Sequence, residues 1–391
     1  MANASPILSD ELLRRFHERA PVYDRENRFF AEDFEDLRKT DYLKMAVPRE
    51  FGGRGMTLAE CCLETRRLAY WAPATALAVN MHTYWCGVAR EVKASGDASC
   101  DWILKAAGEG EIFAAGHAEA GHDLPVLLST TKAEKVPGGF RYTGRKSFGS
   151  LSPAWTYLGL HGMDSSNPEA PKIVHGFLTR DTKGYRIEHT WDVLGMRATQ
   201  SDDTILEGAF VPDARIARIV APGAGGVDVF VLSIFAWALL GFANVYYALA
   251  RRAFDLTLES LPKRQSLAVS TSMAHHPAMQ WGVAEMAMEL ETIEPLIERT
   301  ASDWSNGVAH GGAWPAKIVT AKYRAVEGAW KIVDTALELS GGFGMFKKSE
   351  LERLFRDARA GRFHPANSAL THELVAKTML GINPDDPPRW G

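Results

Sequence analysis

Two histidines are the residues of this sequence best suited to transfer a proton near neutral pH. His364 stands in the segment RFHPAN, residues 362–367, and His82 stands in NMHTYW. An unperturbed imidazole titrates near neutral pH. Because His364 precedes Pro365, its backbone is confined to extended geometry, which indicates a loop. A packed or capping role is the simpler alternative for each histidine.

Metal and disulfide chemistry have little support in the sequence. The twelve histidines include no HExxH motif, which is the usual ligand spacing on a helix. His275 and His276 are adjacent, and neighbouring residues on a helix point too far apart to bind one ion. The four cysteines form no CxxC pair, so we expect free thiols in a reducing cytoplasm and no metal site. They are Cys61, Cys62, Cys86 and Cys100.

The composition is that of an ordinary globular protein. The 391 residues are 46% hydrophobic and 24% charged, with a formal net charge of -4. Without a basic stripe, a nucleic acid is not an expected partner. The N-terminal residues lack the apolar segment of a secretion signal. The apolar run from Val227 to Ala250 contains Asp228 and Asn244, so we expect a buried bundle helix and no membrane span.

Three regions of different periodicity must position these residues. Up to residue 110, apolar residues recur at spacings of three and four, which predicts an all-α domain (1–110). Residues 111–225 hold short β-branched and aromatic runs between turn residues, which predicts a β-barrel or sandwich domain. Helical periodicity returns in four segments of residues 226–391, which predicts a four-helix bundle. The expected fold class is therefore α+β.

The order of these regions, together with their motifs, resembles the acyl-CoA dehydrogenase superfamily over nearly the whole chain. The matching motifs are VPREFGG, FAAGHAEAGHD, GRKSFGS, LGMRATQSDDTILEGAFVP, VAEM and ELSGGFGM followed by LERLFRDAR. Each motif alone is weak, but their order and spacing are specific. The resemblance implies the acyl-CoA dehydrogenase fold and a homotetramer. It also implies FAD, held between the β domain and the bundle and partly by a neighbouring subunit.

The resemblance places the flavin ring against the β domain. Phe113 and Gly116 would lie along the isoalloxazine. Phe148 stands where a tryptophan packs on the ring, and Ser150 stands where a threonine bonds its edge. An aromatic face shields a flavin and hydrogen-bond donors tune it, so these roles are chemically reasonable. The alternative is that Phe148 belongs to the β core and Ser150 to a turn.

Other residues are implied to hold the flavin phosphates and the substrate. Gly341 and Gly342 would let the backbone approach a pyrophosphate, although a glycine pair is also a common helix C-cap. Arg264 is the implied phosphate contact, and Asn367 replaces a threonine of the family. His122 stands where a serine meets the thioester ligand. The remaining residues expected in an apolar substrate pocket, or equally in the core, are Trp237, Tyr246 and Tyr247.

The departures from the family concern the catalytic base. Pro365 stands where the common members have a glutamate, and Ala238 stands where a second group has it. Neither residue accepts a proton, whereas removal of a proton beside a thioester carbonyl needs a positioned base. The flavin motifs are also altered, because Glu338 and Pro277 replace two glutamines.

Three functions are compatible with these observations. The first is an FAD-dependent dehydrogenase that oxidises the Cα–Cβ bond of an acyl thioester, with His364 or another group as base and an electron-transfer flavoprotein as partner. The second is a two-component monooxygenase that takes reduced FAD or FMN from a flavin reductase, with His82 and His364 shuttling protons. The third is a non-catalytic subunit of a hetero-oligomer. The whole-chain resemblance favours the first.

Overall fold

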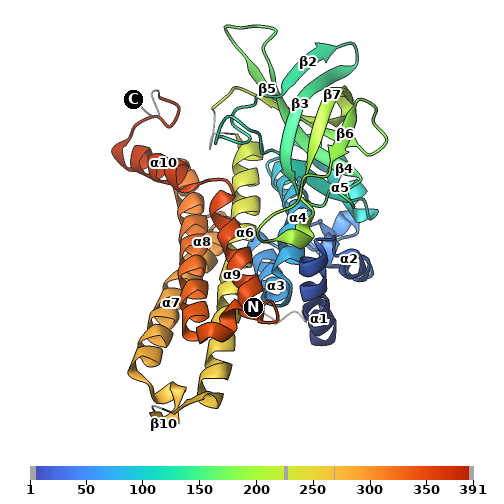
Figure 1. Ribbon diagram of the computed structural model, residues 1–391. Helices are drawn as coiled ribbons and strands as arrows, with labels where there is room; N and C mark the ends of the chain where they lie inside the picture. The colour runs from blue at the N-terminus through green and yellow to red at the C-terminus, as the bar shows by residue number, and fades with distance from the viewer. Residues whose placement is uncertain (1–5, 224–227, 268, 387–391) are drawn as a thin grey trace.

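A computed structural model describes residues 6–223, 228–267 and 269–386, in which the chain runs from helices through a sheet into a long bundle (Figure 1). The N-terminal helices begin with standard caps: Ser9 accepts the Leu12 N–H, and Thr57 and Glu60 form a reciprocal capping box. These helices are α1 (Asp10–Glu26), α2 (Ala31–Arg38), α3 (Leu58–Trp71), α4 (Pro73–Ala94) and α5 (Asp101–Gly108).

The middle of the chain forms an eight-stranded sheet in the order β6-β7-β3-β2-β4-β5-β8, with β1 paired parallel to β4. Strand β5 is buried at almost every position, because α4 covers this part of the sheet. Gly159 leaves room there for Trp85 of α4, since a Cβ at residue 159 would come within 2.4 Å of the indole. The strands are β1 (Phe113–Gly116), β2 (Lys132–Val136), β3 (Gly139–Gly149), β4 (Tyr157–Asp164), β5 (Lys172–Thr179), β6 (Tyr185–Glu188), β7 (Asp202–Pro212) and β8 (Ile216–Val220).

The C-terminal region is the expected bundle with one further helix. Helix α9 falls in LERLFRDAR, a segment placed before the last helix but not assigned as helical from the sequence. Its arginines pair within the fold, and Arg356 binds Asp24 of α1 and Glu352. The elements are α6 (Val229–Ser260), β9 (Gln265–Ser266), β10 (Val269–Ser272), α7 (Pro277–Ser305), α8 (Trp314–Leu339), α9 (Glu350–Ala360) and α10 (Ser368–Leu380).

Helix α6 is the core helix of the molecule. With its short extension to Lys263 it is long and apolar enough to cross a membrane, but 83% of its most apolar window is buried inside the protein. It is covered by helices of both the N-terminal region and the bundle (Figure 1). At Gly87 of α4, a Cβ would come within 2.0 Å of the Trp237 ring of α6. The structure thus contains the buried helix that the sequence indicates.

The bundle separates two ends of the molecule. The sheet lies at one end of α8, and the β9–β10 hairpin lies at the other (Figure 1). Val319 and Leu339 of α8 are twenty residues apart, which corresponds to about 30 Å along a helix. Residues near β9–β10 are therefore remote from those near the sheet.

Candidate active site

The loop between α9 and α10 brings His364 against the core of the bundle. A short turn, Gly361–Phe363, follows α9, and Asn367 caps α10 by accepting the Leu370 N–H at 2.9 Å. Gly361 is required by the close approach of this turn to the bundle, since a Cβ there would come within 2.8 Å of Val326. The loop is thus held against both α6 and α8.

His364 has one ring nitrogen engaged and one available. Nε2 lies 2.8 Å from the Tyr246 hydroxyl, and the ring stacks on Phe242 with centroids 4.6 Å apart. The residue as a whole is partly exposed, and among the described residues Nδ1 makes no hydrogen bond. Burial of the side chain, assisted by the charge of Lys322, lowers the pKa of His364 to about 3. The imidazole is therefore neutral at pH 7 and is a weak proton acceptor, but it can relay a proton without a net charge when one ring nitrogen takes up a proton as the other releases one.

An apolar cavity of about 360 Å³ opens beside this loop. Ala366 of the loop lies in its wall, opposite the leucines of the segment that follows β1. Its charged residues include Glu373 and Lys377 of α10, which form a 2.9 Å ion pair, and Lys377 also donates to two backbone carbonyls. The apolar residues of the wall are Leu124, Leu127, Leu128, Pro222, Phe235, Pro315, Val319, Ala366, Leu370, Leu374 and Pro384.

The two positions at which the family keeps its glutamate carry no proton acceptor here. Pro365 precedes the cavity residue Ala366, and Ala238 is buried on α6. Glu373, which lies in the cavity wall, is neutralised by Lys377. A neutral His364 is the group placed by the fold beside the empty base position.

His82 is placed differently from His364. Its Nδ1 accepts the Phe113 N–H at 3.1 Å, so Nε2 carries the proton and donates to the Leu43 carbonyl at 2.7 Å. The ring is buried, which lowers the pKa of His82 to about 4. Both nitrogens are used to join α4 to β1 and to the preceding loop. We therefore assign a structural role to His82 and propose no catalytic role for it.

The residues expected at the flavin ring form a surface beside β3. Phe148 has a left-handed backbone (φ 56°) and is 57% exposed, with Trp191 packed against its edge at 5.8 Å. Ser150 is hydrogen-bonded to Ser201 at 2.8 Å, and Ser201 to Thr199 at 2.7 Å. An exposed aromatic face beside a chain of hydroxyls suits a flat polar ring system. Trp191 was not assigned to this surface from the sequence; it lies in the loop between β6 and β7.

Three other expected contacts lie in the protein interior. Phe113 is fully buried, its ring stacks on Tyr157 at 5.0 Å and its N–H is bonded to His82, so it does not reach a ligand. Gly116 packs close to the Lys146 side chain. Trp237 is buried between α4 and α6 and donates to Glu91 at 3.2 Å, which makes it a packing residue rather than a cavity wall.

His122 belongs to a buried ionic hub behind the cavity wall. Its Nε2 lies 2.9 Å from Glu119, and its Nδ1 accepts the Leu124 N–H at 3.1 Å. Glu119 also binds the buried ammonium of Lys146 and the hydroxyl and N–H of Thr131. These donors hold the pKa of Glu119 far below its usual range. The hub thus shapes the loop that supplies three leucines to the cavity.

Three further histidines lie next to this hub. His161 and His175 are fully buried and face each other across β4 and β5, and the partly buried His117 follows β1. His161 contacts the Leu128 carbonyl at 2.9 Å, whereas both ring nitrogens of His175 have no partner among the described residues. Among the described residues, no group of three His, Cys, Asp or Glu side chains is arranged to hold a metal ion.

Arg264, Gly341 and Gly342 come together at the remote end of the bundle. Arg264 donates to the Leu339 carbonyl, and its second terminal nitrogen lies 3.4 Å from where a Gly341 Cβ would stand. Gly342 has open space at its Cβ position. These residues lie about 30 Å from the cavity, as the length of α8 shows. Within one chain, therefore, the residues expected to bind the flavin phosphates do not lie near the residues expected to bind the flavin ring.

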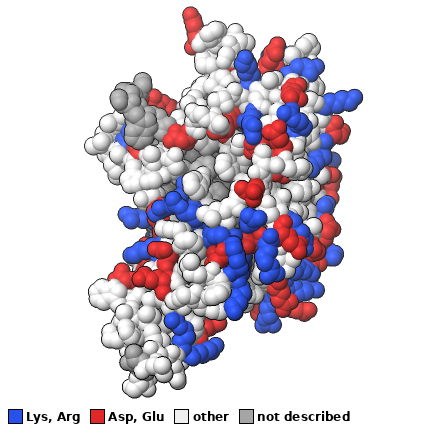
Figure 2. Space-filling view, viewed as in Figure 1, with Lys and Arg blue, Asp and Glu red and all other residues white. Residues whose placement is uncertain are grey.

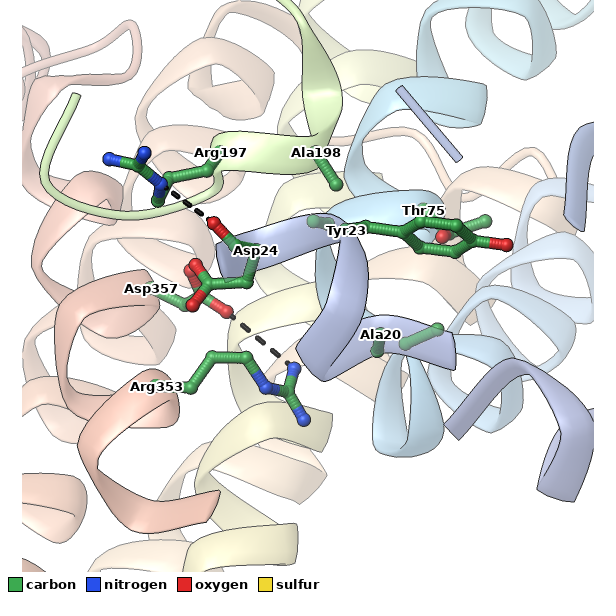
Figure 3. A pocket seen from close by; sticks show the side chains of 10 residues that line it. Ala20, Tyr23, Asp24, Thr75, Arg197, Ala198, Arg353 and Asp357 are labelled. Atoms are coloured by element: carbon green, nitrogen blue, oxygen red, sulfur yellow. Dashed lines mark hydrogen bonds and ion pairs between the residues drawn. The ribbon is translucent and has the colours of Figure 1, made fainter. Parts of the chain in front are cut away.

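A small closed cavity marks the junction of α1, α9 and the loop before β7 (Figure 3). Its volume of about 10 Å³ is near the room that one water needs. Figure 3 shows Arg197 donating to the Asp24 carbonyl and Arg353 facing Asp357. Burial raises the pKa of Asp357 to about 6. This polar junction anchors α9, and through it the His364 loop, and offers no room for a substrate.

The sequence matches two family profiles. Residues 9–97 match the profile described as acyl-CoA dehydrogenase, N-terminal domain, and residues 240–369 match acyl-CoA dehydrogenase, C-terminal domain. YdbM of Bacillus subtilis (strain 168), which carries the name of an acyl-CoA dehydrogenase, is 25% identical over 368 residues, 93% of each chain. The amino sugar nitrososynthase DnmZ of Streptomyces peucetius is 26% identical over 368 residues, 92% of this chain and 88% of its own.

The fold is similar to that of a solved structure of KijD3 in complex with FMN and a dTDP-linked amino sugar. The TM-score is 0.85 at 23% sequence identity, and the match covers 96% of this chain and 93% of that one. The likeness extends over the helices, the sheet and the bundle together.

Proposed function

Because the chain belongs to the acyl-CoA dehydrogenase family, we propose that it is a flavin-dependent monooxygenase acting on an apolar substrate. The observation that carries this proposal is the base position: Pro365 and Ala238 stand where a glutamate is needed for dehydrogenation, and a neutral His364 stands beside them. Oxygen insertion requires no removal of a carbon-bound proton by a strong base. The nitrososynthase relative supports the same choice.

The residues present fit a flavin. Phe148 offers an open aromatic face, the buried hydroxyl of Ser150 lies two residues further along the chain, and Gly342 offers an open backbone. A bound reduced flavin supplies the two electrons that activation of O₂ needs. In the overall reaction, substrate-H, O₂ and reduced flavin give substrate-OH, water and oxidised flavin. His364 would relay a proton at Nδ1 to the departing oxygen, and the apolar wall would exclude water. A flavin reductase is the expected electron-donating partner.

A second candidate is dehydrogenation of an acyl thioester, which the sequence resemblance favours. One observation supports it: Glu373 places a carboxylate in the cavity wall. To act as a base, Glu373 would have to leave its ion pair with Lys377.

One comparison separates the two reactions. We expect the purified protein to hydroxylate an apolar substrate in air when reduced flavin is supplied by a reductase. Anaerobic addition of acyl-CoA thioesters to the flavin-loaded protein should leave the oxidised flavin spectrum unchanged. Bleaching by thioesters would instead establish dehydrogenation. A protein that takes up no flavin would be a non-catalytic subunit.

Filling the cavity tests its role in substrate binding. We expect Leu374→Trp to weaken binding of a neutral naphthylamine dye by about tenfold, equivalent to about 1.4 kcal/mol, because the indole would occupy the apolar space. Flavin affinity should not change. Ala376→Trp adds the same ring on an exposed face of α10 and is the matched control. Equal dye affinity in both variants, measured by fluorescence titration, would remove the cavity from the proposal.

The remote end of the bundle supports the proposed homotetramer. Exposed apolar side chains gather there, and Figure 2 shows few charges on this part of the visible face. We name these residues the end surface: Leu267, Trp281, Met288, Phe343, Met345 and Phe346. Exposed apolar residues gathered in this way mark an association site. Association there would let Arg264 and the glycine pair of one copy serve the flavin of another.

Charge placed in the end surface should disrupt assembly. Trp281 is 72% exposed, so Trp281→Glu is expected to leave the monomer folded while desolvation of the carboxylate opposes contact. Sedimentation velocity should show a shift from tetramer to smaller species, with flavin affinity lowered by about tenfold or more. Leu63→Glu, at another exposed apolar position, should keep the tetramer. Assembly that survives Trp281→Glu would place the interface elsewhere.

The four cysteines are buried free thiols, which is compatible with the proposed reducing, cytoplasmic location.

A further inference from the structure

A buried lysine holds the loop that carries His364. Lys322 of α8 is 2% exposed, and its Nζ donates to the His364 carbonyl at 2.9 Å and to the Ala366 carbonyl at 3.0 Å. These two carbonyls flank Pro365. The lysine therefore fixes the backbone on both sides of the family's base position.

The charge of this lysine is uncompensated within the described part of the chain. No carboxylate lies within ion-pair distance of Nζ. Glu327, on the same helix, is paired with Arg362 at 2.6 Å, and the loop and α6 present His364 and Tyr246. Burial lowers the pKa of Lys322 to about 7 against the opposing influence of Glu327. Because burying an ammonium without a counter-ion is costly, its retention calls for a physical reason.

The position of Lys322 relative to the cavity supplies that reason. Val319, one turn earlier on α8, and Ala366 both lie in the cavity wall. Since the Ala366 carbonyl points at Lys322, the N–H of Asn367 in the same planar peptide points to the other side of the loop. The positive charge thus sits directly behind the wall, where it favours any negative charge on a molecule bound in front.

We propose that Lys322 is a positioning residue of the site, which orders the His364 loop and favours the anionic, reduced form of a flavin bound against Asn367, the flavin contact expected on this loop, over the oxidised form. The second half of this inference rests on the proposed function. The first half does not, because it concerns the loop alone.

The experiment compares Lys322→Met and Lys322→Arg with Lys317→Met, which removes an exposed lysine from the same helix. Hydrogen exchange of residues 361–371 should be faster in Lys322→Met than in the control, since two carbonyls lose their donors. The ratio of the affinities for reduced and oxidised FAD should fall about tenfold in Lys322→Met. Lys322→Arg should restore the ratio.

The pH profile gives a readout that loop order alone would not change. In the wild type, the ratio of the affinity for reduced FAD to that for oxidised FAD should fall as pH rises through about 7, because the ammonium of Lys322 loses its charge. That step should be missing from both variants: arginine stays charged and methionine is never charged. Unchanged exchange of residues 361–371 would overturn the positioning role. A normal affinity ratio in Lys322→Met would overturn the electrostatic role, and failure of every variant and the wild type to bind FAD would overturn the proposed function instead.

Discussion

His364→Ala should lower the rate of substrate hydroxylation by about a hundredfold or more, which is the usual contribution of a positioned proton-transfer group. His364 is the imidazole beside the empty base position, and its Nδ1 is available while Nε2 contacts Tyr246. Alanine also leaves the buried Tyr246 hydroxyl without a partner, which costs about 1–3 kcal/mol of stability. The rate should therefore be measured under conditions in which the variant is fully folded.

Two variants separate the chemical effect of His364 from the structural one. Tyr246→Phe removes the same hydrogen bond but keeps the imidazole, so its rate should fall much less. His372→Ala removes an exposed histidine of α10 and should have full activity. Because the pKa of His364 is lowered to about 3, the wild-type rate should show no His364 titration between pH 5 and 8. A His364→Ala variant with full activity would assign the residue to packing.

Local patterns predicted the elements of this protein, because they depend on neighbours in sequence. The 3.6-residue periodicity of α6 and the turn residues between strands gave the order of helices, sheet and bundle. The loop at His364 was also predictable, since Pro365 restricts the residue before it. Helix α9 was also predictable, because Leu351, Leu354 and Ala358 recur at helical spacing, although its ion pair with Asp24, more than 300 residues away, was not.

The site was less predictable, because its geometry depends on contacts between distant segments. His82 was expected to shuttle protons, but the backbone at Leu43 and Phe113 occupies both of its nitrogens. Trp237 was expected in the substrate pocket or equally in the core, and its ring packs against Gly87 in the core. Lys322 did leave a signal: it stands with Val319 and Val326 on the apolar face of α8, where a lysine is unusual.

The histidines inside the fold predict strong sensitivity to acid. Burial is the main cause that lowers the pKa of His82 to about 4 and of His175 and His364 to about 3, and it also lowers the pKa values of His117 and His161. In the unfolded chain each titrates near 6.5. Below that pH the unfolded state binds more protons than the folded state, so stability falls as pH falls.

From pH 6.5 to 5, each of the three histidines whose pKa is lowered to about 3 or about 4 should remove about 2 kcal/mol from the free energy of unfolding, and His117 and His161 act in the same direction. Asp33 and Asp357 act in the opposite direction, because their pKa values are raised to about 7 and about 6 and their protonation favours the folded state. Because there are more such histidines than such aspartates, the net effect of acid is a loss of stability. The free energy of unfolding of a typical domain is only about 5–15 kcal/mol. Urea titrations should therefore show a large loss of stability between pH 6.5 and 5, with unfolding near the lower limit.

His175→Phe isolates one part of this acid sensitivity. Both ring nitrogens of His175 are buried without partners, and the ring packs against Phe230. A phenyl ring keeps the packing and removes the titrating group, so stability at pH 7 should stay equal or rise. At pH 5 the variant should be more stable than the wild type by about 2 kcal/mol, which is the share of one histidine. His372→Phe, at an exposed site, should not change the pH dependence. If His175→Phe has the same slope of stability with pH as the wild type, the neutral buried histidines are not the cause of acid unfolding.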